Sequence, residues 1–143
     1  MLGVFSALEV ASSGLSAERI RMNTIAGNLA NARTTRTENG GPYKRLDPVF
    51  EAVGLDRDSA LSGASQGVSM VRVARIVQDQ RPGQMVYEPG HPDANAAGYV
   101  EYPNVNVVEE MVNLITASRA YEAGVTSIDT VKQMAKSAID LGR

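Results

Sequence analysis

The chain has 143 residues, of which 43% are hydrophobic, 21% charged and 5% aromatic, and its formal net charge is -2. This length suits a single domain, and the slightly acidic balance argues against a nucleic-acid binder, which needs a basic surplus or patch. Cysteine is absent, which excludes disulfides, thiol catalysis and zinc–thiolate sites.

Residues 1–32 carry a seven-residue repeat of apolar side chains. The first row is Met1, Leu8, Leu15, Met22 and Leu29, and the second is Val4, Ala11, Ile25 and Ala32, broken only by Glu18. A narrow apolar stripe of this kind is typical of a coiled-coil seam. The repeat predicts an N-terminal helix about 45 Å long.

The N-terminus has neither the basic start nor the long apolar stretch of a secretory signal peptide. No apolar run approaches the roughly 20 residues that a membrane span needs. Taken alone, these two observations indicate a cytosolic protein.

The last turns of this first helix, NTIAGNLANA, contain residues that weaken helices. Asparagine and glycine cost roughly 0.5–1 kcal/mol each relative to alanine. Asn31 is explained as a helix end, since asparagine tolerates the left-handed cap conformation. Asn28 lies beside Leu29 of the stripe, where a polar residue fixes register and partner choice, and Gly27 would let another helix approach closely. Two interpretations stay open here: a frayed end with asparagine caps, or a recognition stretch for neighbouring helices.

Residues 33–104 differ in character, because they hold all six prolines and most of the glycines. The alternation in residues 68–79 gives the best strand signal, and residues 83–90 and 97–104 predict two shorter strands bounded by glycine and proline. Residues 43–53 are ambiguous, although Asp47-Pro48 favours an extended edge. Residues 33–45 and 54–67 read as loops. A small β-rich insert is expected.

Residues 105–143 return to a helical pattern. Asn106, followed by Glu109, predicts a capped start. One apolar row is Val107, Leu114, Tyr121, Ile128 and Ala135, and a second is Met111, Val125 and Ile139. The predicted fold is α+β, with two long helices paired as an α-helical coiled coil around a β-rich middle, and with both termini at one end. Because a bare helix pair leaves apolar surface exposed, further partners are expected: copies of the chain or related chains.

Signs of chemistry are weak throughout the chain. His91 lies in a Pro-Gly turn with no nucleophile near it in the sequence, so a turn residue is preferred over a general base. The stretch that begins at Asp56 starts like a calcium loop but lacks the turn glycine and the bidentate glutamate. Glu109 and Glu110 suit a helix start through the helix dipole. Lys44 and Arg45 form too small a basic cluster to predict nucleic-acid binding. We therefore expect no catalytic residue, no cofactor and no metal.

The two ends of the chain resemble a known family. RMNTIAGNLANA and NVNVVEEMVNLITASRAYEAG are similar to the N- and C-terminal motifs of bacterial flagellar rod, hook and hook-associated axial proteins. GGPYKR and VYEPGHPDANAAGYVEYPNVNVVEEMV, together with the small size, narrow the resemblance to proximal rod members. One departure is Gly124, where the family more often has asparagine; it predicts a local loosening of the helix.

The resemblance implies a structural subunit that polymerises through its terminal helices and orders them on assembly. The implied partners are other copies of the chain, other rod proteins, the basal-body base and the flagellar type III export apparatus, without nucleic acid or membrane insertion. The implied location is the periplasmic rod, reached without a cleaved signal, which replaces the cytosolic reading. The alternatives are another rod subunit or a cytosolic coiled-coil adaptor.

Two sets of residues carry these expectations. The subunit-packing seam is Leu8, Leu15, Met22, Ile25, Leu29, Leu114, Tyr121, Val125 and Ile128. The family motif is Asn23, Asn28, Ala30, Asn31, Glu109, Glu110, Met111 and Tyr121. The expected segments are an N-terminal helix over 1–32, a loop and β-rich middle over 33–104, and a C-terminal helix over 105–143.

Overall fold

A computed structural model describes residues 2–54 and 69–141, and the expected loop over 54–67, with its calcium-like start, lies almost wholly outside these residues. The element order is α1 (Leu2–Ala30), β1 (Leu46–Gly54), β2 (Ser69–Gln78), β3 (Gln84–Tyr87), β4 (Tyr99–Tyr102) and α2 (Val107–Leu141). The expected α+β class is confirmed, with long helices at both ends and small antiparallel sheets between them.

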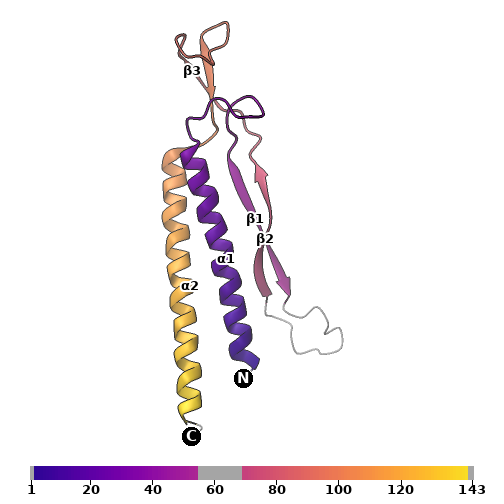
Figure 1. The fold of residues 1–143 in the computed structure, drawn as a ribbon, viewed down its shortest axis with the longest axis vertical. Coiled ribbons are helices and arrows are strands. Elements are labelled where there is room, and N and C mark those ends of the chain that lie inside the picture. The colour runs from indigo at the N-terminus through magenta and orange to yellow at the C-terminus, as the bar shows by residue number, and fades with distance from the viewer. Residues whose placement is uncertain (1, 55–68, 142–143) are drawn as a thin grey trace.

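The two helices lie side by side and run in opposite directions, so both termini lie at the same end of the molecule (Figure 1). None of the described helices combines the length and the apolarity that crossing a membrane requires. Supercoiling of the pair into a true coiled coil remains a prediction.

The strands form two separate antiparallel pairs, β1 with β2 and β3 with β4. The β1–β2 ribbon packs along α1 on the side away from α2, and the β3–β4 hairpin lies at the end opposite the termini (Figure 1). The expected edge strand at Asp47-Pro48 is confirmed, because β1 pairs on one side only and Pro48 lies opposite Ile76. A proline fits here because an edge strand leaves some N–H groups without a ladder partner.

The two helices pack closely at a glycine. A side-chain carbon built on Gly124 of α2 would lie 2.7 Å from Cδ2 of Leu15 of α1. Gly124 therefore gives Leu15 the space to pack, instead of loosening the helix as the sequence suggested. The α2 row that turns toward α1 includes Glu110, Ala117 and Gly124, the first two of which are buried.

The second apolar row expected on this helix does not face α1. Met111, Val125 and Ile139 are 54%, 39% and 56% exposed. The inward row lies one residue earlier in each heptad, where Ala117 and Gly124 are small and Glu110 is buried.

The apolar core is small and lies toward one end of the helix pair. Among the described residues, and leaving proline aside, the buried apolar side chains are Ala17, Ile25, Val100 and Ala117. Within the described parts of residues 3–16 and 118–141, no residue is buried. The helix pair is therefore held firmly near the insert and weakly toward the two termini.

This distribution of burial predicts where a protease cuts the isolated chain first. Trypsin is expected to cleave after Lys132 and Lys136 before it cleaves after Arg72 or Arg75, although all four side chains are exposed, because only the two arginines lie on a paired strand. Mass spectrometry of a digestion time course gives the order. Early cuts within β2 while the C-terminal turns stay intact would contradict it.

Candidate functional site

Asn28, near the C-terminal end of α1, lies at the centre of a buried polar junction. Its side chain is fully buried. Its Nδ2 donates to the carbonyl oxygen of Leu46 at 2.9 Å and to Oε2 of Glu110 at 3.0 Å. Its Oδ1 accepts from the Leu46 N–H and from the Tyr43 hydroxyl, both at 2.9 Å. Because an asparagine amide offers two donors and two acceptor sites, all of its capacity is used.

Glu110 brings α2 into the same junction. Its carboxylate is 1% exposed, and its Oε1 accepts a 2.7 Å hydrogen bond from Nε of Arg45. Arg45 also lies 3.3 Å from Asp47. A buried charge of this kind is tolerated only where it is paired and hydrogen-bonded, and Arg45 with Asn28 provides both.

Burial and charge shift the acid–base behaviour of the junction. Burial, followed by the negative charge of Glu110, raises the pKa of Tyr43, so its hydroxyl stays protonated and donates to Asn28. Burial alone would lower the pKa of Arg45, but its hydrogen bond to Glu110 and the charges of Glu110 and Asp47 outweigh that effect and raise it. The raised pKa of Arg45 keeps its guanidinium charged, so it can pair with Glu110.

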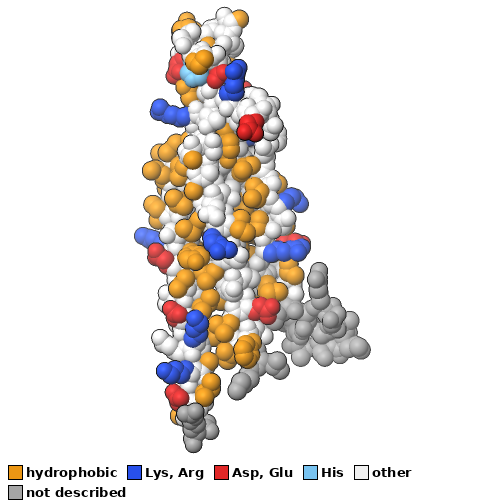
Figure 2. Space-filling view, in the orientation of Figure 1, with side chains coloured by type: hydrophobic (Ala, Val, Ile, Leu, Met, Phe, Trp, Pro, Cys, Tyr) orange, Lys and Arg blue, Asp and Glu red, His pale blue; other side chains and the backbone are white. Residues whose placement is uncertain are grey.

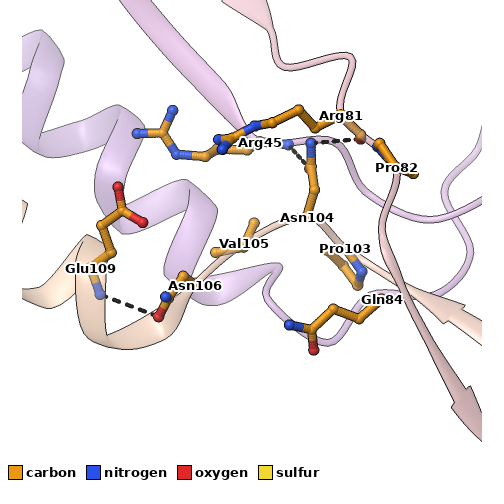
Figure 3. Close-up of a pocket in the computed structure, with 9 residues that line it drawn as sticks. All are labelled: Arg45, Arg81, Pro82, Gln84, Pro103, Asn104, Val105, Asn106 and Glu109. Atoms are coloured by element: carbon orange, nitrogen blue, oxygen red, sulfur yellow. Dashed lines mark hydrogen bonds between the residues drawn. The ribbon is translucent and has the colours of Figure 1, made fainter.

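A second asparagine, Asn104, joins the segments that lead into α2 (Figure 3). Its Oδ1 accepts from the Arg45 N–H at 2.8 Å, and its Nδ2 donates to the carbonyl oxygens of Asp79 and Arg81 at 3.1 Å. Two residues later, Asn106 Oδ1 accepts from the N–H groups of Val108 at 3.1 Å and Glu109 at 3.4 Å. The cap at Asn106 is therefore confirmed.

Asn31 closes α1 by a different route from the one expected. Its Nδ2 donates to the Gly27 carbonyl oxygen at 2.9 Å, and its Oδ1 accepts from the Thr34 hydroxyl at 3.1 Å. Among the described residues only glycines have positive φ, so Asn31 is not left-handed. The side chain itself satisfies the end of the helix. No atom lies within 4 Å of a side-chain carbon built on Gly27, so no helix of this chain uses the space there.

The weak chemical signals resolve into structural contacts. Nδ1 of His91 accepts from the Asp93 N–H at 3.1 Å within a turn, and Asp93 accepts from the Thr35 hydroxyl at 2.8 Å. Lys44 pairs with Glu101 at 3.5 Å. In the part of the chain that the structure describes, no group of three or more acidic or histidine side chains could hold a metal ion. His91 and Lys44 therefore each have a structural partner within the chain.

The predicted seam residues differ in burial, and Val125 is the one that is exposed. Ile25 is buried, and the others of the set except Val125 are half-buried; these are Leu8, Leu15, Met22, Leu29, Leu114, Tyr121 and Ile128. Of the predicted motif residues, Asn28, Asn31, Glu110 and Tyr121 make contacts inside the chain, whereas Asn23, Ala30, Glu109 and Met111 are exposed. The exposed members are available to other chains.

Sequence reasoning missed Arg45, Tyr43 and Asn104 as structural residues and assigned Glu110 only to the helix dipole. One signal was present: Glu110 lies three residues after Val107, which is a stripe position, and a carboxylate there requires a buried partner. The cation that pairs with it, Arg45, comes from a loop 65 residues earlier in the chain.

Comparisons with known proteins agree at both ends of the chain. Residues 8–36 match the family "Flagella basal body rod protein", and residues 96–141 match "Flagellar basal body rod FlgEFG protein C-terminal". The chain is 45% identical to flagellar basal-body rod protein FlgC of Borreliella burgdorferi, with 96% of this chain and 97% of that protein covered. It is 40% identical to FlgC of Bacillus subtilis, with 97% and 98% covered. It is 41% identical to FlgC of Escherichia coli O157:H7, with 99% and 100% covered.

The buried junction predicts a large difference between two asparagines of the same helix. Asn28→Ala leaves Oε2 of Glu110 and both backbone groups of Leu46 without their Asn28 partner, so it should lower the free energy of unfolding by about 3 kcal/mol. Asn23→Ala removes an exposed side chain and should change that free energy by less than about 0.5 kcal/mol. Urea unfolding of both purified variants makes the comparison. Similar effects would mean that the junction does not stabilise the chain.

Proposed function

The chain belongs to the flagellar basal-body rod protein FlgC family, and we propose that it polymerises through its terminal helices into the proximal rod. It is a structural subunit of the flagellar rod, located in the basal body, where it assembles with other rod components, and it is not an enzyme. In this proposal the packed helices transmit torque and enclose the channel through which the flagellum exports its subunits. Residues 1–32 and 105–143 form the coiled-coil core, and residues 33–104 form the middle domain.

The exposed surface of the chain supports polymerisation. Its accessible area is 10,226 Å², whereas a compact monomer of 15.2 kDa exposes about 7,100 Å². An excess of about 3,000 Å² lies in the range that obligate interfaces cover. Hydrophobic side chains are distributed over the length of the helix pair in Figure 2.

The thin core supports ordering on assembly. Among the described residues, a few buried apolar side chains and one polar junction provide little to offset the conformational entropy of two long helices. In the free chain we expect the helices to be anchored at the Asn28 junction and to fray toward both termini. Neighbouring subunits then supply the missing packing. Because the helix ends are loose in the free chain, free subunits do not polymerise early.

Export and location follow from the same proposal. The subunit passes through the flagellar type III apparatus with loosely held termini and without a cleaved signal, and it assembles in the periplasm. The absence of cysteine suits that oxidising compartment, because no disulfide can mispair there.

A substitution in the helix seam tests the proposal. Leu15→Ala empties the space beside Gly124 and should cost about 2 kcal/mol or more in each assembled subunit, so recovery of the chain in purified basal bodies should fall sharply. Thermal unfolding of the free chain should change little, because the termini are expected to be loose there.

The matched control is Arg19→Ala, which removes an exposed side chain one turn further along α1. This variant should assemble normally. If neither Leu15→Ala nor Ile128→Ala reduces incorporation, assembly through the terminal helices is wrong. If Leu15→Ala strongly lowers the melting temperature of the free chain, ordering on assembly is wrong.

A further inference from the structure

An apolar ridge runs along the first turns of α2 on the side that faces away from α1. Its four residues are Val108, Met111, Val112 and Ile115, which are 70%, 54%, 57% and 56% exposed. Their spacing of i, i+3, i+4 and i+7 is the pattern by which a helix anchors itself in a groove. The ridge does not contact α1, because α1 packs against the opposite face of α2, which carries Glu110 and Ala117.

A groove lies lower on the same molecule. It has a volume of about 480 Å³ and lies between α2 and the β1–β2 ribbon, over the middle of α1. Its small lining residues include Ala11, Gly14 and Ala120, and its larger apolar ones include Phe50 and Val71, which are 40% and 38% exposed. No atom lies within 4 Å of a side-chain carbon built on Gly14, so a helix could approach closely at that point.

We propose that the ridge of one subunit inserts into the groove of a second copy of this chain; the inference rests on the proposed function and specifies its contact. The two features match in length, because the groove follows α1 from Ala11 to Glu18 and the ridge runs from Val108 to Ile115, which is about 10 Å in each case. Burying them contributes part of the area that the monomer leaves exposed.

The charges near the groove favour a contact in which both copies point in the same direction. When two copies point in the same direction, the Val108 end of the ridge lies level with Glu18 at the upper end of the groove. Oε2 of Glu18 is buried and accepts no hydrogen bond from the described residues, and its nearest cation, on Arg21, is 3.8 Å away. The start of the neighbouring α2 carries the positive end of the helix dipole, which favours a carboxylate there.

The contact determines the geometry of the assembly. Gly124 marks the level of the groove on α2, and Val112, in the ridge, precedes it by twelve residues, or about 18 Å. Each subunit is therefore displaced along the helix axis by about 18 Å from the one it contacts. Two different surfaces joined with a displacement give an open helical array and not a closed ring.

Paired cysteines test the contact, because the natural chain has none. Gly14→Cys has room for the new side chain, and Val112→Cys replaces an exposed one. In basal bodies that contain the double variant, mild oxidation should give a ladder of dimers and higher multimers. Each single variant should give none, and the free double variant in dilute solution should also give none.

A second pair examines the competing surface. Ala26→Cys with Val112→Cys places the ridge against the exposed face of α1 instead, without displacement. A ladder from this pair, or no ladder from either pair in incorporated protein, overturns the contact. A cross-link to a chain of different mass overturns the assignment of a second copy as the occupant. Absence of the unmodified chain from basal bodies would instead refute the proposed function.

Recovery of charged variants in basal bodies tests the same contact without cysteine. Val112→Asp and Gly14→Asp place a charge in the ridge and in the groove, and each should reduce recovery in basal bodies at least tenfold. Thr130→Asp, which is also exposed on α2 but lies about four turns beyond Ile115 and outside both the ridge and the groove, should leave recovery unchanged. Equal recovery of all three variants overturns the proposal.

Discussion

The structure depends on one constraint: a buried carboxylate on α2 must find its partners in other segments of the chain. Glu110 is bonded by Arg45 from the loop and by Asn28 from α1, and Asn28 in turn holds both backbone groups of Leu46 at the start of β1. Hydrophobic contacts tolerate sliding, because any apolar face will cover another. A buried ion pair with all its hydrogen bonds made does not, since a shift of one residue would leave a charge unpaired. The junction therefore sets the register of α1 on α2 and the position of the insert together.

Away from this junction the helix pair buries little apolar surface within the chain. Two positions of the inward row of α2, Ala117 and Gly124, are small, and Gly124 leaves the space that Leu15 occupies. These positions bury little area, while Val108, Met111, Val112 and Ile115 stay exposed on the outer side of α2. In a helical domain that is stable as a monomer, the large apolar residues would face the other helix and the small ones would face solvent. The arrangement found here stabilises the subunit only enough to define its shape and leaves most of the apolar surface for its neighbours.

The sequence predicted the parts of the fold that depend on local patterns. The heptads indicated both helices, the alternation near residue 73 indicated β2, and Asn106 indicated the start of α2. The row that faces α1 was off by one residue, because Met111 and Val125 are as apolar as any core residue and periodicity alone cannot tell an internal contact from an external one. The junction could not be predicted, because Arg45 and Glu110 are far apart in the chain. Asn28 was recognised as unusual, but its partners depend on tertiary structure.

The same reasoning explains why a helix ends in residues that weaken it. Asn28, Asn31 and Gly27 cost helix stability individually, yet each has a task that alanine could not perform or leaves a space that alanine would fill. The Asn28 side-chain amide pairs with the backbone of Leu46 as a neighbouring strand would. The Asn31 amide donates to the carbonyl oxygen of Gly27. A helix built from stronger formers would continue past residue 30 and carry the chain away from the insert. Weak helicity at this position is therefore the condition for a sharp exit from α1, and that exit brings Tyr43 and Arg45 back to the junction on which the register depends.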